Sequence, residues 1–303
     1  MAEPPARHRQ ILLDGGMGRE LRARGVELSE TIWSANGLLV APDVVRQIHI
    51  DYIDAGAEVI TTNTYGVIRT DLGNAGIEDR FAELNVLAGE LARDARAASG
   101  RPVLIAGSLP PLRGSYRPDL VGPLDELRPL YREQADLLAT YVDLLLCETM
   151  SSGGEALAAA SAAAETGLPV WVSFTLDDHD LGRLRSGETI GDALQLLRDL
   201  PVEGVLANCC TPESISAALA EIVCSGRPFT GGYANTFQSV PREWTLEGDG
   251  FLPTRDDLDP EAYATYARTW LEAGATVVGG CCGTGPEHIR RLRTLIDTAS
   301  IQA

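Results

Sequence analysis

Short apolar runs alternate with longer segments rich in alanine and leucine from one end of the chain to the other. Most of these runs are apolar at every position and lack the alternation of a half-exposed strand. Continuous apolar strands are typical of a parallel sheet that is covered on both faces. The runs predict strands at residues 10–14, 58–62, 103–107, 143–148, 170–175, 204–208, 229–233 and 276–280.

The segments between the runs predict helices, among them residues 42–55, 80–98, 129–140, 153–165 and 260–273. Ser152 precedes one of these helices and Asp259-Pro260 opens another, and both are common helix-start signals. Eight strands, each followed by a helix, predict an α/β protein that forms a single (β/α)8 TIM barrel. We expect this domain to span residues 1–303, with residues 1–9 as a flexible N-terminal tail. A doubly wound open sheet is the alternative architecture.

Polar side chains follow nearly every predicted strand. In a (β/α)8 barrel these positions meet at the carboxyl end of the strands, where active sites lie. The long irregular stretch 233–259 is expected to form a loop over this mouth. The strand ends carry Asp14-Gly15-Gly16, Thr61-Thr62-Asn63, Gly107-Ser108, Glu148-Thr149, Ser173-Phe174-Thr175, Asn208-Cys209-Cys210, Tyr233-Ala234-Asn235 and Cys281-Cys282.

Charge and composition narrow the possible functions. The net charge of −18 argues against nucleic acid and anionic membranes as partners. All 25 basic residues are arginine, so Schiff-base chemistry through lysine is excluded. No apolar stretch approaches the ~18 residues of a membrane-spanning helix, and the N-terminus lacks a signal-peptide pattern. We therefore expect a soluble, cytoplasmic protein.

Four of the six cysteines form two adjacent pairs at strand ends, Cys209-Cys210 and Cys281-Cys282. In a reducing compartment, clustered thiols indicate metal binding or catalysis more than disulfides, which remain the lesser alternative. Soft thiolate ligands favour Zn²⁺. The pairs therefore predict a zinc site. Cys147 and Cys224 are expected to be structural, and no proton-transfer role is assigned to the four histidines.

Several of these motifs occur together in one known family. The chain resembles the homocysteine S-methyltransferases in five segments: Asp14-Gly15-Gly16-Met17-Gly18, Thr62-Asn63-Thr64-Tyr65, Glu148-Thr149-Met150, Asn208-Cys209 and Gly279-Gly280-Cys281-Cys282-Gly283-Thr284. The resemblance implies a (β/α)8 barrel in which Cys209, Cys281 and Cys282 bind one zinc ion. Cys210 has no counterpart among the family's ligands and is expected to pack in the core. Gly66 and residues 234–237 depart from the family pattern, which leaves the methyl donor open.

The resemblance also implies an activity, methyl transfer to homocysteine to give methionine. Three thiolates around zinc leave one coordination position open, and a substrate thiol that enters it loses its proton. The resemblance assigns Glu148 to homocysteine's amino group; a structural salt bridge to an arginine is the alternative. Asp14 is expected to assist, unless it caps the next helix. The amides of Gly15 and Gly16 are candidates for the carboxylate, and Thr62 is a further hydrogen-bonding candidate.

The donor is expected to be a sulfonium compound, with S-methylmethionine favoured and S-adenosylmethionine second; betaine, a quaternary ammonium compound, is the third candidate. Aromatic faces stabilise such a cation, and Tyr65, Tyr233, Trp244 and Phe174 are the candidates at the mouth. Another thiol or selenol acceptor is an alternative. A zinc-binding barrel that acts as a sensor or assembly component, and a lyase on the same barrel, are the alternatives from other classes. Oligomeric state is not predicted.

Overall fold

A computed structural model describes residues 9–244 and 252–301. The predicted flexible tail therefore lies outside the described residues except for Arg9, whose guanidinium forms an ion pair with Glu58 at 2.6 Å. Residues 245–251, in the predicted mouth loop, also lie outside the described part. Within that part no helix combines the length and the apolarity that a membrane crossing requires.

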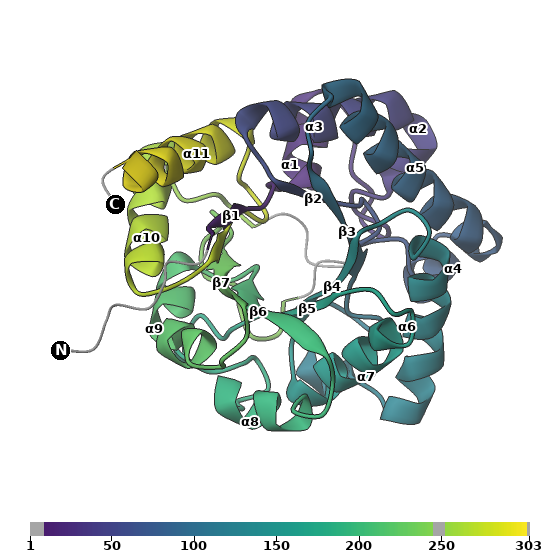
Figure 1. The fold of residues 1–303 in the computed structure, drawn as a ribbon. Coiled ribbons are helices and arrows are strands. Elements are labelled where there is room, and N and C mark those ends of the chain that lie inside the picture. Colours follow the sequence, from purple (N-terminus) through teal and green to yellow (C-terminus); the bar gives the residue numbers. More distant parts are fainter. Residues whose placement is uncertain (1–8, 245–251, 302–303) are drawn as a thin grey trace.

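The described residues contain one sheet of eight parallel strands in the order β1-β8-β7-β6-β5-β4-β3-β2. The strands are β1 (Ile11–Leu12), β2 (Val59–Thr61), β3 (Leu104–Leu109), β4 (Leu144–Met150), β5 (Val170–Phe174), β6 (Val202–Asn208), β7 (Phe229–Tyr233) and β8 (Val277–Val278). Leu13 pairs in parallel with Val59, and the Asp14 N–H donates to Val59 O at 3.0 Å. These contacts join the first strand to the second and close the ring (Figure 1). The predicted barrel is confirmed and the open sheet is excluded.

Helices surround the ring of strands (Figure 1). They are α1 (Met17–Ala23), α2 (Asn36–Val40), α3 (Pro42–Ala55), α4 (Arg69–Asn74), α5 (Phe81–Ser99), α6 (Leu124–Leu138), α7 (Gly153–Ala164), α8 (Ile190–Leu196), α9 (Pro212–Val223), α10 (Pro260–Glu272) and α11 (Pro286–Ile301), with short 3-10 turns η1 (Glu78–Arg80) and η2 (Pro118–Leu120). Ser152 and Asp259 cap α7 and α10 by accepting from Glu155 N and Ala262 N, as predicted.

The predicted start of α6 is wrong. Pro129 does not open this helix but lies inside it, five residues after its first residue, Leu124. A proline so early in a helix removes one backbone hydrogen bond, and the remaining turns continue past it. Asp125 and Glu126 occupy the first turn, where acidic side chains favour a helix N-terminus.

Successive strand residues point alternately into two apolar clusters. Leu145 and Cys147 of β4 belong to the large core that includes residues from the surrounding helices, whereas Leu144 and Leu146 belong to a smaller one built mainly of strand residues. Both faces of the strand are therefore buried. This is why the strands read as continuously apolar in the sequence.

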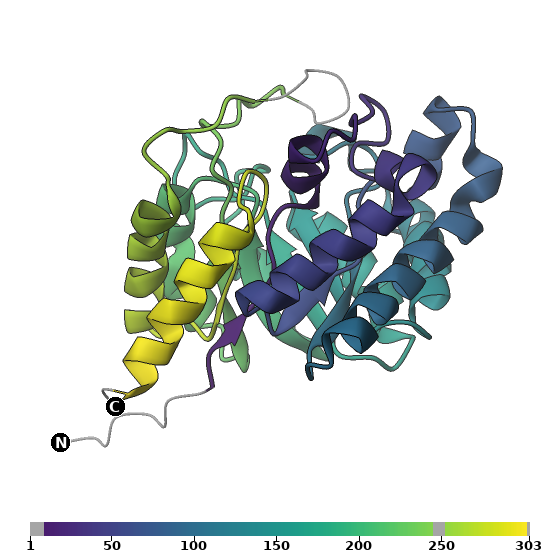
Figure 2. The same cartoon turned by 90° about the horizontal axis from the view of Figure 1, so that it is seen from above.

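The connections that follow the strands gather at one end of the barrel. In the side view, the chain leaves β1 toward α1, which lies beyond the carboxyl ends of the strands (Figure 2). The described flanks of the predicted mouth loop lie there too. The Thr236 N–H donates to Cys282 O at 2.9 Å, and the Arg185 guanidinium donates to Val240 O at 3.1 Å.

Candidate active site

A cavity of about 920 Å³ opens at the carboxyl end of the barrel. Its lining includes all the predicted zinc ligands and homocysteine-binding residues: Asp14, Gly15, Gly16, Thr62, Glu148, Cys209, Cys281 and Cys282. The flank 252–260 of the loop after β7 contributes to its outer wall. The barrel thus brings these residues from five of its strand ends into one cavity.

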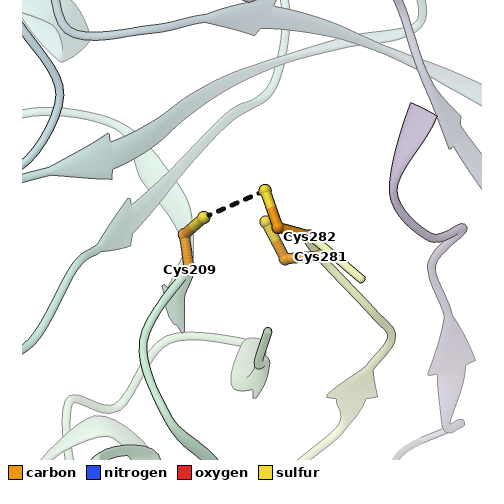
Figure 3. A group of neighbouring side chains, drawn as sticks. All are labelled: Cys209, Cys281 and Cys282. Carbon is orange, nitrogen blue, oxygen red and sulfur yellow. Dashed lines mark hydrogen bonds between the residues drawn. The ribbon is translucent and has the colours of Figure 1, made fainter. Parts of the chain in front are cut away.

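The three predicted zinc ligands lie together. The sulfur atoms of Cys209, Cys281 and Cys282 all fall within 4.8 Å of one another, and Cys209 Sγ lies 3.6 Å from Cys282 Sγ. Figure 3 shows Cys209 on one chain segment facing the other two cysteines across the gap. All six cysteines are free thiols, so the alternative of a disulfide is not what the structure contains.

Local backbone geometry decides which cysteine of the first pair faces the cavity. Cys209 directly follows β6 and has a positive φ of 54°, an uncommon conformation for a residue other than glycine. Cys209 lines the cavity, whereas Cys210 packs in the large apolar core, where burial raises the pKa of its thiol well above the usual range. The expectation that Cys210 is a core residue is confirmed.

The second pair is held in a tight turn after β8. Thr284 donates to Cys281 O twice, from its N–H at 3.2 Å and from its Oγ1 at 2.7 Å. Gly283 supplies the positive φ of 81° that this turn requires. Cys281 and Cys282 therefore reach the cavity side by side from one rigid turn.

The three thiols influence one another's pKa. Hydrogen bonds from Cys281 and Cys282 lower the pKa of Cys209 well below the ordinary thiol value. The same bonds to the Cys209 thiolate raise the pKa of Cys281 and Cys282. A divalent cation would replace these protons, because metal binding requires the deprotonated form of each ligand.

The donor set fits zinc. A tetrahedral zinc ion with Zn–S bonds of about 2.3 Å separates its sulfur ligands by about 3.8 Å, and the distance between Cys209 Sγ and Cys282 Sγ is 3.6 Å. Three cysteines also leave a fourth position open, as catalytic zinc sites do. Within the described residues these cysteines are the group that meets the spacing of a metal site.

Glu148 lies near the carboxyl end of β4, two residues before Met150, as a buried carboxylate in the same cavity. Ser108 Oγ donates to its Oε1 at 2.5 Å and Tyr233 OH donates to its Oε2 at 3.2 Å. Burial raises the pKa of Glu148 to about 7, despite these hydrogen bonds. No arginine among the described residues forms an ion pair with it, so the salt-bridge alternative finds no support.

Asp14 lies after β1 and also lines the cavity. Its carboxylate accepts from the Thr61 N–H at 2.8 Å and from Thr61 Oγ1 at 3.1 Å. Burial raises the pKa of Asp14 to about 7, and the nearby charge of Glu148 adds to the effect. Asp14 does not cap the next helix, because the N-cap of α1 is Gly16, which has no side-chain cap. The capping alternative is wrong.

Gly15 and Gly16 permit a close approach between the end of β1 and the cysteine turn. A Cβ atom on Gly16 would lie 2.7 Å from Cys281 O, and one on Gly15 would lie 2.9 Å from Thr284 Oγ1. The Gly16 N–H already donates to Thr284 O at 3.2 Å. Of the two predicted carboxylate donors, the Gly15 amide is therefore the better placed.

Thr62 lies in the cavity lining, but its hydroxyl is engaged within the barrel. Thr62 Oγ1 accepts from the Ser108 N–H at 3.1 Å and shares a hydrogen bond with Thr64 Oγ1 at 2.9 Å. These contacts join the ends of β2 and β3. They also fix Ser108, whose hydroxyl reaches Glu148.

The predicted aromatic candidates divide into two groups. Tyr65 and Tyr233 line the cavity, whereas Phe174 is fully buried in the large core and takes no part in the lining. Trp244 packs behind the lining, with its ring centroid 5.4 Å from that of Tyr116. Trp33, which the sequence did not suggest, lies in the lining instead.

Of the two remaining cysteines, only Cys147 packs as predicted, and two of the histidines are buried. Cys147 is buried in the core, and Cys224 is exposed at the end of α9. His288 accepts from the Gly285 N–H at 3.2 Å and its Nε2 lies 3.3 Å from Leu258 O, which is a local structural role. Burial lowers the pKa of His49 to about 4, so this side chain stays neutral.

Sequence reasoning missed two supports of the cysteine site. Tyr116 OH lies 2.9 Å from Cys209 Sγ. Asn208, named only as a motif residue, accepts from the Thr149 N–H at 2.9 Å and from Ser173 Oγ at 2.7 Å, and its Nδ2 lies 3.9 Å from Cys281 Sγ. Asn208 stands beside Cys209 in the motif and could have been found there, but Tyr116 lies in an irregular loop without a signal.

Fold and site together define a (β/α)8 barrel with a three-cysteine centre and two buried carboxylates in one cavity at its mouth. The family model described as homocysteine S-methyltransferase matches residues 11–296. The chain belongs to the homocysteine S-methyltransferase family, and it is therefore a methyltransferase. This membership sets aside the sensor and lyase alternatives.

Individual relatives span nearly the whole chain. A homocysteine S-methyltransferase from Escherichia coli is 31% identical, over 93% of this chain and 94% of that protein. A selenocysteine methyltransferase from Astragalus bisulcatus is 28% identical, over 96% of this chain and 93% of that protein. The crystal structure of the metallated homocysteine methyltransferase MmuM from Escherichia coli matches with a TM-score of 0.79 and 30% identity, covering 94% of this chain and 96% of that one.

Proposed function

We propose that this protein transfers a methyl group from a sulfonium donor to the thiol of L-homocysteine, with one zinc ion held by Cys209, Cys281 and Cys282, and forms methionine. The observation that carries the proposal is the placement of three convergent cysteine sulfurs and two buried carboxylates in one cavity. Homocysteine has a thiol at one end and an ammonium group at the other, so it matches both features.

The carboxylates would bind the amino group of the acceptor. Glu148 and Asp14 are both buried, and burial raises the pKa of each to about 7. A ligand ammonium between them would offset the cost of burying their charge. The Gly15 amide would donate to the ligand carboxylate from the same side of the cavity.

The three cysteines would hold the acceptor's sulfur end. Held by these three thiolates, a zinc ion would offer an open coordination position and would lower the pKa of a substrate thiol placed there. The lining of the cavity would orient the donor toward the reacting sulfur. The thiolate set also requires a reducing environment, which favours the cytoplasm.

The donor would lie along the aromatic part of the lining. Tyr65 and Trp33 belong to the cavity wall and pack with the cysteine group in one cluster. Aromatic faces stabilise a sulfonium charge without competing as nucleophiles. We favour S-methylmethionine as the donor, S-adenosylmethionine second and betaine third. Selenocysteine is the second candidate acceptor, because a relative named for that activity matches almost the full chain.

A donor screen tests the proposal. Zinc-loaded protein would be offered L-homocysteine with S-methylmethionine, S-adenosylmethionine, betaine or dimethylsulfoniopropionate, and methionine would be measured by mass spectrometry. We expect methionine with at least one sulfonium donor, and loss of product when a chelator has removed the metal. L-selenocysteine in place of homocysteine measures acceptor preference. Absence of methionine with every donor would contradict the proposal.

A further inference from the structure

Tyr116 contacts the cysteine centre from a connection that carries none of the three cysteines. It follows β3 in the chain, and its hydroxyl lies 2.9 Å from Cys209 Sγ, 93 residues further on. The side chain is only 2% exposed. A metal-bound cysteine is a thiolate and has no proton to donate, so the phenol must be the donor in this hydrogen bond.

The ring of Tyr116 is held in place by two further groups. Trp244 packs against it with ring centroids 5.4 Å apart, and the Arg185 guanidinium lies 5.4 Å from its ring centroid. Arg185 also donates to Val240 O at 3.1 Å and to Pro241 O at 2.6 Å, which fixes the segment that leads to Trp244. The hydroxyl therefore meets Cys209 in one defined position.

The backbone at both ends of this hydrogen bond is strained. Tyr116 has a φ of 65° and Cys209 has a φ of 54°, and neither residue is a glycine. Left-handed conformations of this kind cost free energy and persist where the surrounding structure imposes them, often at functional sites. Strain at the two partners of one contact indicates that their alignment matters.

Resting on the proposed three-cysteine metal centre, we propose that Tyr116 is a positioning residue: it donates a hydrogen bond to the Cys209 thiolate, fixes that ligand's orientation and withdraws part of its charge. The ligand set then becomes unequal. Asn208 Nδ2 approaches Cys281 Sγ only at the longer distance of 3.9 Å. Cys209 is thus the ligand whose electron donation to the metal is most reduced.

The test replaces the phenol alone, with cobalt as a spectroscopic probe. Tyr116→Phe and the unchanged protein are loaded with Co²⁺, and the thiolate-to-cobalt charge-transfer band is recorded. We expect the band of the variant to move to longer wavelength, because a thiolate without the hydrogen bond holds its electrons less tightly. We also expect about 10-fold weaker zinc binding in competition with a chelator, the usual size for a lost outer-shell contact.

Tyr131→Phe is the matched control. Tyr131 is also a fully buried tyrosine, and its hydroxyl has no hydrogen-bond partner among the described residues. We expect its cobalt spectrum and zinc affinity to equal those of the unchanged protein. Equal shifts in both variants would attribute the effect to general loosening and overturn the inference.

Two further outcomes separate this inference from the proposed function. If the unchanged protein shows the charge-transfer band but Tyr116→Phe has the same band and the same zinc affinity, the inference fails and the three-cysteine centre stands. If the unchanged protein binds cobalt without any thiolate band, both fail together.

Discussion

The cavity has two groups of functional side chains, here called the sulfur wall and the carboxylate wall, which differ in chemistry. The sulfur wall, formed by Cys209, Cys281 and Cys282, gathers three groups that become ligands when they lose protons. The carboxylate wall, formed by Asp14 and Glu148, holds two acids whose pKa values burial raises to about 7. Each wall is incomplete without a positive charge, but the sulfurs suit a soft metal ion and the carboxylates suit an ammonium group.

The two walls are also held in place by different kinds of contact. Thr61, Ser108 and Tyr233 donate hydrogen bonds to the carboxylates, which orients them but does not neutralise them. On the sulfur wall, the turn closed by Thr284 fixes the positions of Cys281 and Cys282. The proposed function assigns activation of the acceptor's thiol to the sulfur wall and binding of its ammonium group to the carboxylate wall. Substitutions on the two walls should therefore have separable effects.

The largest effect should come from the sulfur wall. Cys282→Ala removes a ligand, so we expect loss of stoichiometric zinc by elemental analysis and a fall in kcat of roughly 10³-fold or more, since metal activation supplies several kcal/mol. Cys210→Ala is the control, because Cys210 lies beside Cys209 in sequence but packs in the core. A Cys282→Ala protein with full zinc content would show that the site is misplaced.

On the carboxylate wall, Glu148→Gln should leave zinc binding unchanged and weaken the binding of the acceptor. Removing one partner of a buried charge pair costs about 3 kcal/mol, so kcat/KM should fall by roughly 10²-fold with unchanged zinc content. Glu155→Gln is a matched control. Burial raises the pKa of Glu155 to about 7 as well, yet this residue bonds to Ser151 outside the cavity lining. If the two variants lost activity equally, the assignment of Glu148 to the ligand would be contradicted.

The pH dependence of a ligand without sulfur isolates the carboxylate wall further. L-Norleucine carries the ammonium group but no thiol. With a pKa of about 7 for Asp14 and Glu148, these acids are mostly ionised at pH 8 and mostly protonated at pH 6. Ionisation of one such acid changes the Kd by about 10-fold between pH 8 and pH 6, so we expect the Kd of norleucine, measured by calorimetry, to rise by at least about 10-fold over this range. A flat profile would show that the ammonium group binds elsewhere.

The smallest effect should come from the hydroxyl of Thr61. Thr61→Val removes the hydrogen bond to Asp14 Oδ1 at 3.1 Å and keeps the backbone bond to Oδ2. One lost hydrogen bond to a charged group is worth about 1.5 kcal/mol at the low end. The KM for homocysteine should therefore rise by roughly 10-fold in steady-state assays, with zinc content and kcat unchanged. An effect on kcat alone would link Asp14 to the sulfur wall instead.

Local sequence patterns were sufficient to predict the strands of the barrel and the starts of some of its helices. The eight apolar runs match the eight strands within a few residues at each end, because parallel strands buried on both faces leave a continuous signal. Helix starts with a capping side chain, such as Ser152 and Asp259, were also predictable. The start of α6 was predicted wrongly at Pro129, because a proline is compatible with the second turn of a helix as well as with the first.

The sequence by itself determined the barrel, the family and the residue types of the site, since strand ends of a (β/α)8 barrel meet at one face wherever they lie in the chain. Only the tertiary structure decided which of two neighbouring residues faces the cavity and which packs in the core. Backbone conformation sends Cys209 into the cavity and Cys210 into the core, and strand alternation buries Phe174. The contact of Tyr116 with Cys209 depends on how an irregular loop crosses the mouth, and no local pattern encodes such a long-range approach.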